Sequence, residues 1–187
     1  MEKAVTEKAV TGNTVKRRQV YDGKVVDLGV ESAELPNGEV VDLEVVRHMG
    51  AAAVLPVKED GSVILVRQWR HATGGWLLEV PAGKLDPGED PATCARRETE
   101  EEVGWIPGRL EPMGWIWTTP GFCDEKIWLY LAHELRAGQQ NLEEDELLTM
   151  VEMPLAEAAR MAAEGEITDS KTATLILRAA ALRASQE

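Results

Sequence analysis

Two glutamates in one predicted helix are the strongest sign of chemistry in this sequence. Glu98 and Glu102, within ARRETEEEVG at residues 95–104, are four residues apart, so a helix places them on one face, a turn apart. Like charges at this spacing cost about a few tenths of a kcal/mol, and acidic residues in the last turn also oppose the helix dipole. A hard divalent cation, held by carboxylates, a backbone carbonyl, water and substrate phosphates, would satisfy both. We therefore expect a metal site on this face.

A solvated acidic face is the alternative explanation of the same residues, and three features favour the metal site. The small core stripe of the helix, made of Ala92, Thr99 and Val103, places both glutamates near the packed side of the helix. A strand ending in Pro81-Ala82-Gly83 leads directly into the loop before the helix. That loop, KLDPGED, is itself acidic and contains a glycine.

Capping residues set the predicted bounds of this helix. Asp90 suits the N-cap, Pro91 suits the first helical position, and Gly104 suits the position just after the last turn. Two further helices are expected over about 154–164 and 169–184.

Strands are expected from about Arg17 onward, because apolar and alternating segments are separated by turn residues. Pro36-Asn37-Gly38 predicts a hairpin, since Asn-Gly favours a type I′ turn. Glu59-Asp60-Gly61 predicts a second hairpin between AAAVLPV and SVILVRQW. Strands first, one helix in the middle and helices last predict an α+β fold, with helices packed on a mixed sheet.

Charge and composition restrict the partners that we expect. The net charge of −13 disfavours nucleic acid as a partner, and a small anionic substrate would need local cations such as divalent metal ions. No run of 18 apolar residues is present, so we expect no membrane partner, and the N-terminus lacks the apolar centre of a signal peptide. Cys94 and Cys123 have no disulfide or metal spacing, which is typical of a cytoplasmic protein.

The spacing of charged residues and glycines resembles the Nudix box, written G-x5-E-x7-R-E-U-x-E-E-x-G-U, where U is bulky and apolar. All seven fixed positions are present: Gly83, Glu89, Arg97, Glu98, Glu101, Glu102 and Gly104. Two U positions depart mildly, because Thr99 replaces an aliphatic residue and Trp105 is larger than usual. Both are packing positions, so the metal site remains the expectation.

Further segments resemble the ADP-ribose pyrophosphatase branch of the Nudix hydrolases: VRQWR (66–70), WLLEVPAGKLDPGE (76–89), TPGFCDE (119–125) and EGEITDSKT (164–172). The resemblance implies a Nudix-like α/β/α sandwich with a mixed sheet over residues 51–187. It also implies a β-rich extension over 17–50 that builds a homodimer, although that segment could be an ordinary sheet edge. Residues 1–16 are expected to be disordered.

The resemblance also implies roles for particular residues. Mg²⁺, with Mn²⁺ as a possible substitute, would be bound by Glu98, Glu102, Glu146 and the carbonyl of Ala82. Arg97 would orient glutamates. The substrate would be contacted by Arg70 at its diphosphate and by Arg47, with a surface cation as the alternative for Arg47, and Pro120 is a marker of ADP-ribose specificity.

The catalytic base is expected in the acidic segment NLEEDEL, residues 141–147. Alignment within the family places Glu144 on the base, and a shift of one residue would give Glu143 or Asp145 this role. Glu101 and Glu125 are alternative bases. Trp69 and Trp76 are candidates for stacking on the adenine.

The reaction that we expect is Mg²⁺-dependent hydrolysis of ADP-ribose to AMP and ribose 5-phosphate. Metal ions would neutralise the diphosphate and activate a water, and a carboxylate would take its proton. The alternatives are hydrolysis of another nucleoside diphosphate sugar, a broad range of nucleoside diphosphate derivatives, and a sensor that binds ADP-ribose without cleaving it.

Overall fold

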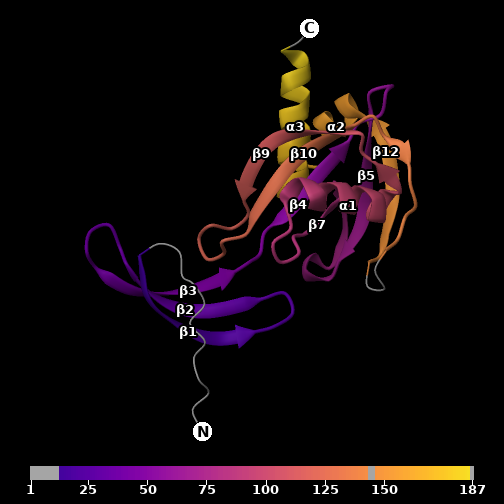
Figure 1. Cartoon of the computed structure of the whole chain (residues 1–187). Helices are drawn as coiled ribbons and strands as arrows, with labels where there is room; N and C mark the ends of the chain where they lie inside the picture. The colour runs from indigo at the N-terminus through magenta and orange to yellow at the C-terminus, as the bar shows by residue number, and fades with distance from the viewer. Residues whose placement is uncertain (1–12, 143–145, 186–187) are drawn as a thin grey trace. The chain divides into compact units, whose positions relative to one another are not determined.

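The computed structural model describes residues 13–142 and 146–185, and these form two compact units. The first unit contains residues 13–49 and 117–126. The second contains residues 50–116 and 127–185, apart from the gap at 143–145. Figure 1 labels the elements of both.

The second unit is built on two main sheets. A four-stranded sheet has the order β7-β4-β10-β9 and is mixed, since β4 runs parallel to β10 and antiparallel to β7. A three-stranded antiparallel sheet has the order β12-β5-β6, and β8 and β11 form a short pair. The strands are β4 (Ala51–Pro56), β5 (Ser62–Arg70), β6 (Gly75–Glu79), β7 (Ala82–Lys84), β8 (Trp105–Ile106), β9 (Arg109–Trp117), β10 (Lys126–His133), β11 (Arg136–Ala137) and β12 (Leu148–Pro154), with a 3₁₀ turn η1 at His71–Thr73.

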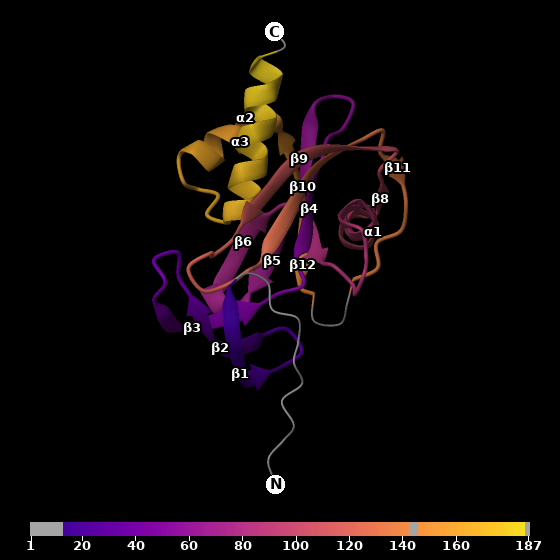
Figure 2. The same ribbon diagram turned by 60° about the vertical axis from the view of Figure 1, so that its left-hand side comes forward.

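Helices cover both sides of these sheets, as Figure 2 shows. They are α1 (Pro91–Val103), α2 (Leu155–Ala163) and α3 (Ser170–Ala184). Every residue of β4 is buried, and successive side chains of a strand point to opposite faces. Ala53 and Leu55 therefore pack in the core that includes α2 and α3, whereas Ala52 and Val54 pack against α1. This two-sided burial confirms the predicted sandwich of helices around a mixed sheet.

The predicted hairpin between AAAVLPV and SVILVRQW is wrong. The turn forms, with the Gly61 amide donating to the Lys58 carbonyl, but pairing stops after the bridge between Val57 and Val63. Beyond it, β4 and β5 enter different sheets. Both strands are nearly continuous apolar runs, which suits central strands: β4 lies between β7 and β10, and β5 lies between β12 and β6.

The first unit contains a three-stranded antiparallel sheet, β1 (Thr14–Asp22), β2 (Asp27–Glu34) and β3 (Val40–Arg47), in that order. The predicted hairpin at Pro36-Asn37-Gly38 is present, with Gly38 at a φ of 84°. Strand β1 begins at Thr14, before the expected start of the extension at residue 17, because Thr14 pairs with Ala33 and its hydroxyl donates to Glu31. Of the other residues expected to be disordered, Asn13 is described and precedes β1, and residues 1–12 lie outside the described residues.

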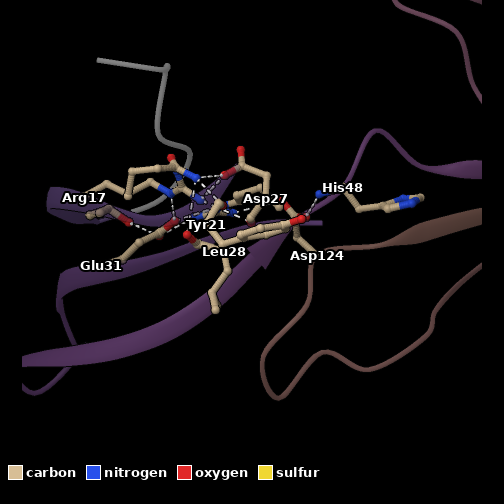
Figure 3. A network of polar contacts seen from close by, with 10 residues as sticks. Arg17, Tyr21, Asp27, Leu28, Glu31, His48 and Asp124 are labelled. Carbon is tan, nitrogen blue, oxygen red and sulfur yellow. Dashed lines mark hydrogen bonds and ion pairs between the residues drawn. The ribbon is translucent and has the colours of Figure 1, made fainter. Parts of the chain in front are cut away.

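A buried carboxylate organises this first unit. Glu31 is 2% exposed and accepts hydrogen bonds from Arg17, Arg47 and Thr14. Burial alone would raise the pKa of Glu31, but the bonds from its partners and the charge of Arg47 outweigh this effect and lower the pKa. Figure 3 shows Arg17 beside Glu31 at one end of the network and Asp124 beside His48 at the other.

Residues 117–126 belong to this unit, although the sequence placed them in the hydrolase domain. Asp124 accepts from the Arg47 guanidinium at 3.0 Å and from the His48 amide at 2.7 Å. Val46 exchanges backbone hydrogen bonds with Phe122 and Asp124. Side-chain and backbone bonds between segments far apart in the chain therefore hold this loop on β3.

Among the helices that the structure describes, none is both long and apolar enough to cross a membrane.

Candidate active site

The acidic helix forms as its capping residues predict. The Asp90 carboxylate accepts from the amides of Ala92 and Thr93, Pro91 is the first helical residue, and Gly104 ends the helix at a φ of 68°. The face of α1 that packs against the sheet is not purely apolar. It includes Glu98 at 7% exposure and Glu102 at 1%, together with four small or apolar residues, Cys94, Ala95, Thr99 and Val103.

Backbone of the preceding strand lies directly against these glutamates. A Cβ atom at Gly83 would overlap the carboxylate of Glu98, so only glycine leaves room for this side chain. The Ala82 amide donates to the Glu102 carboxylate at 3.3 Å. The glycine that begins the box therefore lets the Glu98 carboxylate lie against the backbone of β7.

The two glutamates carry charge that the protein only partly compensates. Burial is the largest effect on each, and it raises the pKa of Glu98 to about 7 and that of Glu102 well above its ordinary value. Glu98 accepts a 2.6 Å hydrogen bond from Arg97, which opposes this shift and which the helix pattern alone did not predict. The charge of Glu146 raises both pKa values further. A bound cation would reverse these shifts.

The donor set fits a hard divalent cation. Among residues 13–142 and 146–185, no three His, Cys, Asp or Glu side chains are gathered closely enough to hold a metal by themselves. Glu98 and Glu102 would therefore supply part of a coordination shell, with the rest left to backbone carbonyl, water and substrate oxygens. Mg²⁺ is commonly bound in this way, through one or two carboxylates and the phosphates of a substrate.

Arg97 connects the acidic residues of the box. Its guanidinium donates to Glu89 at 3.1 Å, to Glu98 at 2.6 Å and to Glu101 at 3.0 Å, and also to the Lys84 carbonyl at 3.2 Å. These bonds lower the pKa of Glu89 despite some burial. Arg97 thus ties the loop before α1 to the helix through hydrogen bonds to three carboxylates and a backbone carbonyl.

Arg70 lies on the same side of the second unit as the glutamates of α1. Ile64 and Val66 of β5 pack with Val103 of α1, and Arg70 continues this even-numbered side of the strand. Burial and nearby carboxylates raise the pKa of Glu102, and the charge of Arg70 offsets part of that rise. Glu79 accepts from its Nε and Nη2, both at 2.8 Å. The structure therefore brings a guanidinium to the carboxylate pair.

The two candidate tryptophans lie on the other face of this hairpin. Trp69 pairs directly with Trp76 across β5 and β6, with ring centroids 5.7 Å apart in an edge-to-face arrangement. Arg67 lies 5.7 Å from the Trp76 ring on the same face. Strand alternation thus directs both rings away from the side that carries Arg70.

The sequence analysis missed two residues of this region, Glu79 and Lys171. Glu79 is 1% exposed and accepts from the Lys171 ammonium at 2.5 Å as well as from Arg70. A single acid inside the apolar segment WLLEVP was the available signal, because a buried carboxylate needs cationic partners.

The remaining predicted residues lie in the first unit or outside the described residues. Arg47 uses all three guanidinium nitrogens on Glu31 and Asp124. Pro120 is in the 117–126 loop, and Glu125 lies 3.6 Å from the His48 ring. Glu143, Glu144 and Asp145 lie outside the described residues.

Comparisons with known proteins identify the family of this chain. A family model for the NUDIX domain matches residues 46–174. An ADP-ribose pyrophosphatase of Bacillus subtilis (strain 168) is 40% identical over 171 residues, covering 90% of this chain and 92% of that protein. A methanol dehydrogenase activator of Bacillus methanolicus is 42% identical over 164 residues, covering 85% and 87%.

A solved structure shows the same fold. The crystal structure of an ADP compounds hydrolase superposes with a TM-score of 0.80 at 22% identity, covering 96% of this chain and 98% of that one. The family model spans more than half of the chain, and it includes the whole of the segment that resembles the Nudix box. The chain therefore belongs to the Nudix family of pyrophosphohydrolases.

Proposed function

We propose that this protein hydrolyses the diphosphate bond of ADP-ribose to AMP and ribose 5-phosphate, with Mg²⁺ as its metal. The observation that carries this proposal is the buried pair Glu98 and Glu102, whose raised pKa values favour binding of a cation. This pair lies on the side of the second unit that also carries Arg70. Most of the chain is also similar to a protein named for ADP-ribose.

The carboxylates of Glu98 and Glu102 and the carbonyl of Ala82 would hold the metal, and Glu146, whose charge already acts on both glutamates, would join them when the metal binds. When bound, Mg²⁺ withdraws charge from the diphosphate and lowers the pKa of water. Arg70 binds non-bridging phosphate oxygens, while Arg97 holds Glu98 and Glu101 in place.

A carboxylate takes one proton from the attacking water as the new phosphorus–oxygen bond forms. The bond from the attacked phosphorus to the bridging oxygen then breaks, so the water oxygen stays on one of the two products, AMP and ribose 5-phosphate, and the bridging oxygen leaves on the other. Glu144 is our first candidate for this base, and Glu143, Asp145, Glu101 and Glu125 are the alternatives. Glu101 already accepts a hydrogen bond from Arg97, so one of its oxygens is occupied.

We also propose that the protein is a homodimer joined through its first unit. The strands of this unit expose large apolar side chains, including Val15, Val20, Tyr21, Val40 and Leu43. A small sheet that leaves such residues in water is a candidate association surface. Sedimentation of the full chain would give one dimeric species, and a monomer at micromolar concentration would contradict the proposal.

The acidic charge of the chain supports a small molecule as its partner, in preference to nucleic acid. Both cysteines are free, which supports a cytoplasmic location.

A substrate screen tests the proposed activity. ADP-ribose, GDP-mannose and dinucleoside polyphosphates are incubated with Mg²⁺ or Mn²⁺, and phosphatase-coupled phosphate release is measured. We expect the highest kcat/KM for ADP-ribose, and no turnover with EDTA. A poor rate with ADP-ribose beside a high rate with another compound would overturn the substrate assignment. Tight binding of ADP-ribose without cleavage would show a sensor instead.

A further inference from the structure

A chain of polar contacts leads from Arg70 into the interior of the second unit. Glu79 accepts from the Nε and Nη2 of Arg70, each at 2.8 Å, and from the Lys171 ammonium at 2.5 Å. Lys171 also lies 3.0 Å from the Asp169 carboxylate. Glu79 is 1% exposed and Lys171 is 9% exposed, while the Arg70 side chain is 40% exposed. Glu79 and Lys171 are therefore largely shielded from solvent, whereas the Arg70 side chain reaches it.

The segment that supplies Lys171 is locked to the end of β6. Asp169 is the N-cap of α3, and it accepts from the amide and the hydroxyl of Thr172. The Thr172 hydroxyl in turn accepts from the Val80 amide at 2.8 Å. Glu79 and Val80, adjacent in sequence, are therefore held by adjacent residues of α3.

This arrangement leaves one nitrogen of Arg70 for a ligand. Nε and Nη2 are occupied by Glu79, and among the described residues no hydrogen-bond partner of Nη1 is present. A carboxylate that accepts two parallel bonds fixes the plane of a guanidinium. Lys171 donates to Oε2 of Glu79, the oxygen that also accepts from Nη2 of Arg70, so it holds in place the carboxylate that orients the guanidinium.

We propose that Lys171 and Glu79 are positioning residues that aim Arg70 at the diphosphate of the substrate. Glu79 holds the guanidinium directly, and Lys171 acts through Glu79, with Asp169 and Thr172 fixing the start of α3. This inference rests on the proposed function for the identity of the substrate. It assigns a role to the TDSKT segment, which contributes no residue to the metal site.

A double-mutant cycle tests the proposal. Lys171→Met, Arg70→Ala and the double variant are compared with the wild type in steady-state hydrolysis of ADP-ribose. We expect Lys171→Met to raise KM by about tenfold with kcat nearly unchanged, because a misaimed Arg70 loses binding made in both ground state and transition state. In the Arg70→Ala background the same substitution should leave KM unchanged, since the group through which it acts is absent.

Lys58→Met is the matched control. It removes the same charge from a surface pair in the same unit, in which Lys58 lies 2.8 Å from Glu152. We expect wild-type KM and kcat from it. An equal rise of KM for Lys171→Met with and without Arg70 would overturn the proposal, and so would no rise in either background. If Lys171→Met does not fold, Lys171→Gln is judged by the same two criteria.

A measurement without substrate separates this proposal from the proposed function. In ¹⁵N-labelled protein the Nε–H signal of Arg70 is assigned by its loss in Arg70→Ala, and its exchange with water is followed by NMR. We expect slow exchange in the wild type and in Lys58→Met, and at least about tenfold faster exchange in Lys171→Met. Unchanged exchange would overturn the positioning role even if ADP-ribose is the substrate. Faster exchange in a protein that does not cleave ADP-ribose would support positioning and reject the proposed function alone.

Discussion

Buried glutamates of two kinds occur in this protein, and their surroundings differ. Glu31 in the first unit and Glu79 in the second each accept hydrogen bonds from two cationic side chains, and each has a lowered pKa in spite of burial. Glu98 and Glu102 on α1 are as deeply buried, yet burial and neighbouring carboxylates raise their pKa values. The first kind connects segments of the fold. The second kind leaves negative charge that a ligand must balance, which is typical of a functional site.

Replacing a glutamate of the second kind should have the largest effect on activity. We expect Glu102→Gln to lower Mg²⁺-dependent kcat by at least about 100-fold, since loss of even an outer-shell partner of a metal costs 10-fold to 100-fold. The free energy of unfolding of the metal-free variant at pH 8 should exceed that of the wild type by about 1 kcal/mol, because a buried charge is removed. Urea unfolding and steady-state kinetics measure both. Full retained activity would remove Glu102 from the metal site.

The same substitution at a glutamate of the first kind should have the opposite effect on stability. Glu79→Gln removes the carboxylate that Lys171 and Arg70 share and leaves buried Lys171 with Asp169 alone, so we expect a loss of about 3 kcal/mol in the free energy of unfolding. Urea unfolding measures it beside Glu102→Gln. If both variants shifted in the same direction, the distinction between the two kinds would fail.

Stability of the metal-free protein should fall as pH rises from about 4.5 to above 7. The pKa of Glu98 is raised to about 7, so Glu98 binds its proton more tightly in the folded protein than in the unfolded chain. Its contribution to the free energy of unfolding is therefore full below the unfolded pKa and is lost as pH rises through the folded pKa. Mg²⁺ needs the ionised carboxylates and should stabilise more at pH 8 than at pH 5. Thermal unfolding with EDTA and with Mg²⁺ checks this. A Tm gain from Mg²⁺ that does not depend on pH would contradict it.

Below pH 4.5 the lowered pKa values of Glu31 and Glu79 should dominate instead. Their contribution is present above the unfolded pKa and is lost as pH falls through the folded values. Metal-free Glu79→Gln should therefore lose less stability than the wild type between pH 4.5 and pH 3. Equal losses in the two proteins would contradict the pairing of Glu79.

The smallest effect is expected at the partly exposed end of the first network. Asp124→Ala removes acceptors from Arg47 and from the His48 amide, but Glu31 still holds Arg47. We expect a loss of about 1 kcal/mol, seen as faster hydrogen exchange of the His48 amide. Asp42→Ala, which breaks an exposed bond to Ser32, is the control and should leave this amide unchanged.

Local features of the sequence determined the acidic helix and its chemistry. Asp90, Pro91 and Gly104 act within a turn of the helix ends, so the bounds of α1 follow from neighbouring residues alone. The spacing of Glu98 and Glu102 likewise follows from helix geometry, and the resemblance to the Nudix box is confirmed by the family model. The bounds of α2 and α3 differ from the predicted ones by about one residue.

Tertiary structure alone decided the relations between distant segments. It separated β4 from β5 and joined residues 117–126 to β3. It also brought Lys171 to Glu79, 92 positions earlier in the chain. A buried charge predicts that a partner exists, but the identity of that partner depends on which strands and helices pack together, and local propensity carries no information about such long-range pairing.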